Sequence, residues 1–142
     1  MPNPTLERLM AAKRPTATLR VCLDPDAAEE TPDDETLYVD IRLQALTREQ
    51  YRLCMDSCPP KEEDVAKAEA AKDTIPVFDE ATFVPTLVAA CSLDPQMTTE
   101  EAKTLLDEWS GGDVAELYIA CLGLCQRSRV DALPKGSAPI TV

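Results

Sequence analysis

The sequence predicts a mainly α-helical α+β fold, with a small N-terminal antiparallel β-hairpin and a C-terminal three-helix unit. Three observations support this prediction. Apolar and polar residues alternate in two short segments of the first third of the chain. Three later segments repeat apolar residues at steps of three and four, each behind a residue that can cap a helix. With 44% hydrophobic residues among 142, the chain can bury one modest core.

The first elements expected are a short helix and the hairpin. The helix lies in the segment LERLMAAKR, with Leu6, Leu9 and Met10 on one face, and Pro15 ends it. The two half-buried strands place these apolar residues on one face: Leu19, Val21 and Leu23, then Leu37, Val39, Ile41 and Leu43. The acidic segment 24–35 between them is interpreted as a solvated loop. Its carboxylates lack the ordered spacing and glycine of a calcium-binding loop.

A helix and a charged linker follow the hairpin. Thr47 and Gln50 have the spacing of a capping box, so a helix should begin there and end before Pro59 and Pro60. Residues 61–72 are rich in Lys, Glu and Ala but have almost no apolar stripe, which is typical of an exposed helix. They form the centre of a linker between the two halves of the chain.

Three capped helices are expected next. Asp79, Thr98 and Ser110 each supply a side-chain oxygen for a first turn, and Thr98 with Glu101 forms a second capping box. The first helix should begin around Glu80, with Pro85 in or near its first turns, and should end at Asp94-Pro95. Gly111 and Gly112 are interpreted as a tight turn between the last two helices. The three apolar stripes comprise Phe83, Val84, Leu87, Val88 and Cys91; Ala102, Leu105, Leu106 and Trp109; and Val114, Leu117, Tyr118, Cys121, Leu122 and Cys125.

These elements divide the chain into four parts. Residues 1–58 hold the first helix, the hairpin and the capped helix; residues 59–77 form the charged helical linker. Residues 78–127 form the three-helix unit. Residues 128–142 contain prolines and a glycine without sustained periodicity, so a flexible tail is expected there.

The charge of the chain restricts its partners. A net charge of −12 and a pI near 4.3 repel nucleic acids and anionic lipid surfaces, so neither is expected as a partner. No apolar run approaches the roughly 20 residues that span a bilayer, and the first residues lack the apolar core of a secretion signal. A cytoplasmic protein with reduced cysteines is therefore expected.

The residue types needed for most catalysis are missing from the sequence. There is no histidine, which removes the commonest general base and metal ligand, and there is no glycine-rich phosphate loop. No enzyme activity, catalytic residue, cofactor or metal site is predicted. One alternative remains open, because Cys54 with Cys58 and Cys121 with Cys125 are spaced i,i+4 and four thiolates can hold a structural zinc ion. The other interpretation is that these cysteines are small buried hydrophobic residues.

Candidate partner-binding residues can be chosen only from the helical stripes. They are Leu87, Leu117, Tyr118 and Leu122, and for each of them burial in the core is the competing interpretation. Trp109 presents the same choice, and as the single tryptophan of the chain it is expected to pack against a neighbouring helix.

The helix series resembles a known family, the tail assembly chaperones of long-tailed phages and related tail-like particles. The resemblance covers Leu46 to Gln126 and is carried by FDEATFVPTLVAACSLDP at 78–95, TTEEAKTLLDEWS at 98–110 and DVAELYIACLGLCQ at 113–126. The N-terminal segment LERLMAAKRPTATLRVCLD also looks like the opening of such proteins. The acidic loop and the paired thiols are not part of this pattern.

The resemblance implies a function in assembly rather than in catalysis. It implies a protein of the bacterial host cytoplasm that binds the tape measure protein and keeps it soluble while tail tube subunits polymerise. The tail tube protein and a longer, frameshifted form of the chain itself are further partners that the family implies. Two other functions stay open: a structural or adaptor subunit that remains in a tail-like particle, and a small zinc-stabilised regulatory domain.

Overall fold

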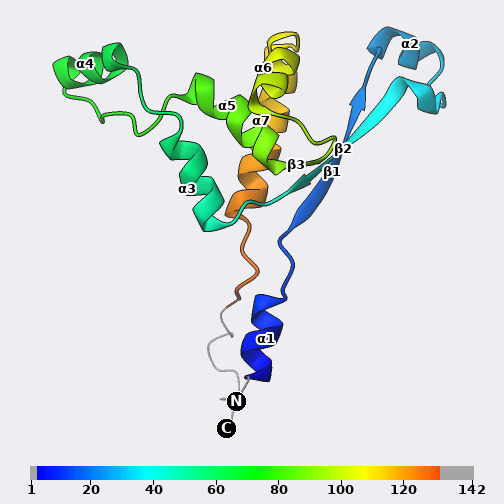
Figure 1. Ribbon diagram of the computed structural model, residues 1–142. Coiled ribbons are helices and arrows are strands. Elements are labelled where there is room, and N and C mark those ends of the chain that lie inside the picture. The colour runs from blue at the N-terminus through cyan, green and yellow to red at the C-terminus, as the bar shows by residue number, and fades with distance from the viewer. Residues whose placement is uncertain (1–2, 132–142) are drawn as a thin grey trace, which may run out of the picture.

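The structure is a computed structural model, and it describes residues 3–131. A three-stranded antiparallel sheet, ordered β1-β2-β3, lies at its centre and consists of Thr16–Cys22, Tyr38–Gln44 and Ser92–Asp94. In Figure 1 the helices α5, α6 and α7 gather beside the sheet, whereas α1, α2 and α4 project away from this centre. The α+β fold class expected from the sequence is confirmed.

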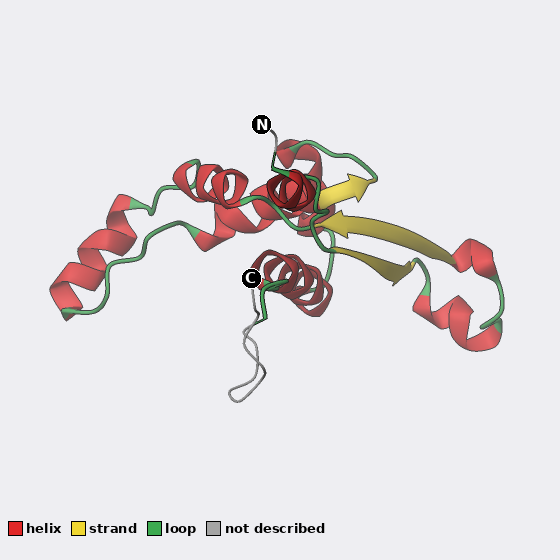
Figure 2. Ribbon diagram, turned by 90° about the horizontal axis from the view of Figure 1, so that it is seen from below, coloured by secondary structure: helices red, strands yellow, loops and turns green. Residues whose placement is uncertain are grey.

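The β-hairpin forms as the alternating pattern predicts. Strands β1 and β2 pair antiparallel from Thr16↔Gln44 to Cys22↔Tyr38. The side chains of Ile41 and Leu43 face the core, at 5% and 0% exposure. Val39 is exposed because the hairpin extends beyond the core at its distal end (Figure 2).

The third strand was not expected. The helix α5, Glu80–Cys91, begins at the predicted residue but ends before Asp94-Pro95, because Ser92–Asp94 leave the helix and pair with β2. The prediction that Asp94-Pro95 ends this helix is therefore wrong. A strand of three residues is too short to show a periodicity, and its pairing depends on a neighbour that lies far away in the sequence.

The segment between β1 and β2 is not only a loop. It contains the helix α2, Pro25–Glu30, and a 3-10 turn at Glu35–Leu37. The Asp24 carboxylate accepts a hydrogen bond from the Ala27 backbone N–H at 3.1 Å, and Pro25 occupies a first-turn position where no N–H is needed. No residue of α2 is buried, so the segment faces solvent as expected.

The helices before the three-helix unit are α1 (Pro4–Met10), α3 (Arg48–Asp56) and α4 (Glu62–Ala71). Both hydrogen bonds of the Thr47–Gln50 capping box are present, at 3.1 and 3.0 Å. No residue of α4 is buried, which confirms that an exposed helix forms in this segment. The segment that contains α4 leaves and rejoins the fold at the same place, because the Asp79 N–H donates to the Cys58 carbonyl at 2.9 Å.

The caps of the last three helices agree only in part with the predictions. Thr98 and Glu101 form the predicted capping box of α6, Thr99–Asp107. Asp79 is the N-cap residue of α5, as predicted, but its carboxylate accepts a hydrogen bond from the Thr82 hydroxyl and not from a backbone N–H. Pro85 lies inside α5, beyond the first turn, where its ring is buried.

The glycine pair also differs from its predicted place. The helix α7, Gly111–Gln126, begins with Gly111 and Gly112, so they belong to its first turn and not to an interhelix turn. The helix can begin immediately because the Ser110 hydroxyl accepts from the Asp113 N–H at 3.3 Å. Neither glycine has a positive φ.

One hydrophobic core joins the sheet to the helices. It contains residues of β2, α5, α6 and α7, namely Ile41, Leu43, Phe83, Leu87, Val88, Cys91, Leu106, Leu117, Cys121 and Leu124, together with Ala45 and Cys58. The Phe83 ring lies within 4.6–6.3 Å of the ring centroids of Phe78, Tyr51 and Tyr118. Within residues 3–131 no helix has the length and apolar content needed to cross a membrane. The tail predicted at 128–142 lies mostly outside the described residues.

Candidate functional site

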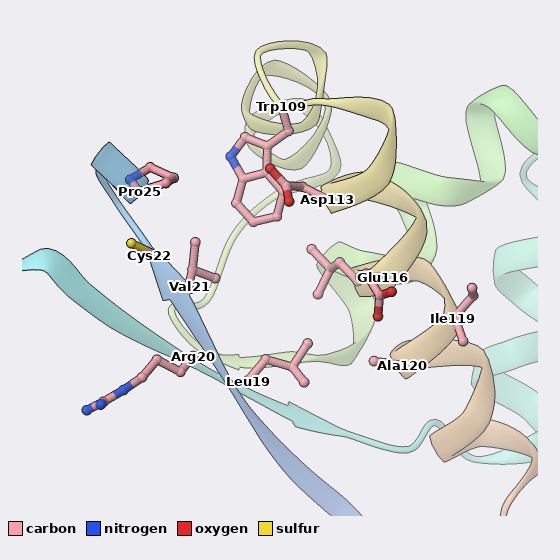
Figure 3. A pocket seen from close by; sticks show the side chains of 11 residues that line it. Leu19, Arg20, Val21, Cys22, Pro25, Trp109, Asp113, Glu116, Ile119 and Ala120 are labelled. Atoms are coloured by element: carbon pink, nitrogen blue, oxygen red, sulfur yellow. The ribbon is translucent and has the colours of Figure 1, made fainter. Parts of the chain in front are cut away.

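A cleft of about 510 Å³ lies between strand β1 and helix α7. Leu19 and Val21 of the strand form one wall, and Leu117 and Ala120 of the helix form the other. Figure 3 shows the Trp109 ring at one end of this cleft, with Val21 beside it. The cleft therefore presents a mainly apolar interior that the chain itself does not fill.

The strand alternation determines which side chains of β1 enter the cleft. Leu19 and Val21 are half-buried and face α7, whereas Arg20 between them points away (Figure 3). On that outer face the Arg20 guanidinium pairs with Glu35 at 2.8 Å and Asp40 at 3.4 Å. Arg20 also borders the cleft, but its guanidinium is directed away from the interior and engaged with these two carboxylates.

The helical wall adds negative charge. Asp113, Glu116 and Ala120 lie at steps of three and four, so they share the face of α7 that lines the cleft. Neither carboxylate forms an ion pair within the described residues. An occupant with an apolar stripe and a lysine or arginine beside it would match this surface in both polarity and charge.

The four candidate partner-binding residues occupy two kinds of position. Leu87 is 0% exposed and Leu117 is 3% exposed, so the structure places both in the core. Leu117 nevertheless lines the innermost part of the cleft. Tyr118 and Leu122 are half-buried and pack against the core from the other side of α7, outside the cleft lining.

Sequence reasoning missed the residue of α7 that is most available to a partner. Ile119 is 62% exposed and lies at the rim of the cleft, although it falls outside the apolar stripe of its helix. A large apolar residue on the polar face of a helix was the signal that could have indicated it. Trp109 combines both roles considered for it, because it packs against the core and lines the cleft.

Five of the six cysteines lie in or against the core, but they do not assemble as two CxxxC pairs. Cys91 lies beside Cys125, with their Sγ atoms 3.9 Å apart, while Cys58 contacts the Thr86 hydroxyl. All six are free thiols. No group of three or more Cys, Asp or Glu in residues 3–131 is arranged to hold a metal ion.

The buried thiols predict a loss of stability in alkaline solution. The hydrogen-bonded Cys121 thiol and burial raise the pKa of Cys91 from 9.0 to about 12, and contact with Cys91 and burial raise the pKa of Cys125. The folded protein therefore holds thiol protons that the unfolded chain releases above about pH 9. This contribution to stability is complete below that pH and is lost as the pH rises towards about 12.

The measurement is the free energy of unfolding in urea at a series of pH values from about 8 to about 11. A double variant, Cys91→Ala with Cys125→Ala, is the control, because it removes both groups while keeping every other titrating residue. The wild type should lose stability more steeply with pH than this variant. Equal slopes would contradict the assignment.

The chain was compared with protein-family models, with curated proteins and with solved structures, and none of them matches it.

Proposed function

We propose that this chain is an assembly chaperone that binds the tape measure protein of a phage tail in the host cytoplasm and keeps it soluble. The observation that carries this proposal is the cleft between β1 and α7, with its apolar interior and acidic helical wall. The resemblance of residues 46–126 to tail assembly chaperones supports the tape measure protein as the partner.

The chemistry of the cleft suits an amphipathic helix. Such a helix presents apolar side chains at steps of three and four, which could contact Leu19, Val21 and Trp109 together. A basic residue on its flank would meet Asp113 or Glu116. Tape measure proteins are expected to be long helical chains with repeated apolar stripes, so one chain would offer many such segments.

The net charge of the chain supports the second half of the proposal. Each bound copy would add a charge of −12 to the complex, and mutual repulsion opposes aggregation of the coated polypeptide. Tail tube subunits would then displace the chaperone as they take over the same apolar segments. A longer form of the chain produced by frameshifting would be recruited through the same domain.

Co-purification tests the proposal. The chain is expressed with a tagged tape measure fragment, and a complex that keeps the fragment in the soluble fraction is the expected result. Emission from Trp109, the single tryptophan, should shift to shorter wavelength if a fragment without tryptophan enters the cleft. A fragment that precipitates equally with and without the chain would contradict the proposal.

The alternative functions give different results in two further measurements. Mass spectrometry of purified particles should detect a structural or adaptor subunit and should not detect an assembly chaperone. Metal analysis of the purified protein should give about one zinc ion per chain for a zinc-stabilised domain. For the proposed chaperone, we expect neither the chain in purified particles nor zinc in the purified protein.

A further inference from the structure

Helix α1 carries an apolar stripe that nothing in the described chain covers. Leu6, Leu9 and Met10 lie at steps of three and four and are 54%, 69% and 79% exposed. No residue of α1 is buried, and none packs against the core. In Figure 1 the helix stands apart from the sheet, beyond the start of β1.

The residues after α1 are fixed to the fold in a way that holds the helix away from its own cleft. The Ala45 N–H donates to the Pro15 carbonyl at 2.9 Å, and the Arg14 guanidinium donates to the Ala45 carbonyl at 3.1 Å and to Gln50 at 2.7 Å. Arg129 donates to the Lys13 carbonyl. With residues 13–15 held in this way, a return of α1 onto Leu19 and Val21 of the same chain would require a sharp turn within Ala11 and Ala12.

The charge of the N-terminal segment is opposite to that of the rest of the chain. Residues 1–15 contain three basic residues and one acidic residue, which gives this segment +2 within a chain of −12. The cleft offers the carboxylates of Asp113 and Glu116, which form no ion pair within residues 3–131, beside an apolar interior. An apolar stripe with flanking positive charge is the kind of occupant that this cleft fits.

We propose that α1 of one copy of this chain lies in the β1–α7 cleft of a second copy. The contact would cover Leu6, Leu9 and Met10 of the first copy with Trp109 and Ile119 of the second. Two copies that each carry a net charge of −12 repel one another. The positive N-terminal segment of one copy is attracted to the acidic cleft of the other, so this contact opposes that repulsion. The surface involved is small, and the association is correspondingly weak.

The two sides of this contact are different surfaces, so it is heterologous. Each copy provides one helix and one cleft, and a copy bound through its helix still has a free cleft for the next copy. The contact can therefore extend into oligomers larger than a dimer. It does not depend on the proposed function, since it requires no other polypeptide. A bound tape measure segment would occupy the same cleft and would therefore compete with α1 of the second copy.

Sedimentation velocity of the full chain over a range of concentrations tests the contact, with Trp109 emission measured on the same samples. Two surface substitutions each remove one side: Leu9→Glu on α1, and Ile119→Lys at the rim of the cleft. Both residues are more than half exposed, and circular dichroism confirms that each variant keeps its helices. Each variant alone should associate roughly tenfold more weakly than the wild type.

Mixing the two variants distinguishes this contact from its alternatives. The Leu9→Glu variant keeps an intact cleft and the Ile119→Lys variant keeps an intact α1, so the mixture should form a dimer with one copy of each and nothing larger. A wild type that stays monomeric, or a mixture that does not associate although the wild type does, would overturn the proposal. So would a Trp109 emission change upon Leu9→Glu that is independent of concentration, because it would place α1 in the cleft of its own chain. Tape measure binding is measured separately, and its failure would leave this result unchanged.

Discussion

Replacing Phe83 with alanine should destabilise this protein by about 3–5 kcal/mol. The side chain is fully buried, and its ring meets those of Phe78, Tyr51 and Tyr118. Removing a buried phenylalanine forfeits the free energy of transfer of its ring and leaves a cavity that neighbouring side chains fill only in part. Domains of this size have a total stability of about 5–15 kcal/mol, so the loss is a large fraction of it.

Phe83 has this effect because it joins parts of the chain that are distant in sequence. Tyr51 belongs to α3, Phe78 lies just before α5 and Tyr118 belongs to α7, and all three rings contact the same side chain. Other large hydrophobic residues must supply the rest of the core, because aromatic residues are only 4% of the sequence. Loss of Phe83 should therefore lower the cooperativity of unfolding as well as its midpoint.

Urea unfolding followed by circular dichroism measures this prediction, and Leu9→Ala is the matched control. Leu9 is also a large apolar residue in a helix, but it is 69% exposed and outside the core, so its replacement should change stability by less than about 0.5 kcal/mol. Similar changes for the two variants would show that Phe83 is not at the centre of the core.

Reversing the acidic wall of the cleft should weaken binding of a tape measure fragment by about tenfold to a hundredfold, if the proposed function is correct. The change is a double substitution, Asp113→Lys with Glu116→Lys. Both carboxylates line the cleft and are exposed, so the substitutions act on the charge presented to an occupant more than on the packing of the core. Lysine at both positions would place like charges opposite the basic residues of the fragment.

Helix α4 provides a control with the same change of net charge. Glu62→Lys with Glu63→Lys also replaces two exposed carboxylates in the first part of a helix, but this helix projects away from the cleft (Figure 1). Fragment affinity from isothermal titration should fall for the cleft variant and stay near the wild-type value for the α4 variant. An equal loss in both would mean that net charge alone governs binding, and an unchanged affinity in both would place the fragment elsewhere.

The parts of the fold that were predicted correctly are those determined by short stretches of sequence. The Thr47–Gln50 and Thr98–Glu101 capping boxes each involve residues three positions apart, and both are formed. The alternation along β1 and β2 likewise reports which face of each strand is apolar. These interactions are local, so the residues that make them are visible together in the sequence.

Two features that escaped prediction depend on tertiary contacts. The strand β3 exists because Ser92–Asp94 meet the free edge of β2, and no local pattern announces that meeting. The helical stripe of α7 showed that Leu117 is apolar, but it could not show that its face is divided between the core and an open cleft. That division is set by the distance between α7 and β1, which belongs to the folded molecule alone.

The hydrogen bond from Asp79 to Cys58 makes residues 59–78 a suitable place to insert a label. Because the two ends of this segment already meet, its length can change without moving α3 relative to α5. A fluorescent protein or an affinity peptide spliced between α4 and residue 76 would therefore label the molecule away from the cleft (Figure 1). Such a graft would allow the molecule to be followed in cells with both of its termini unmodified.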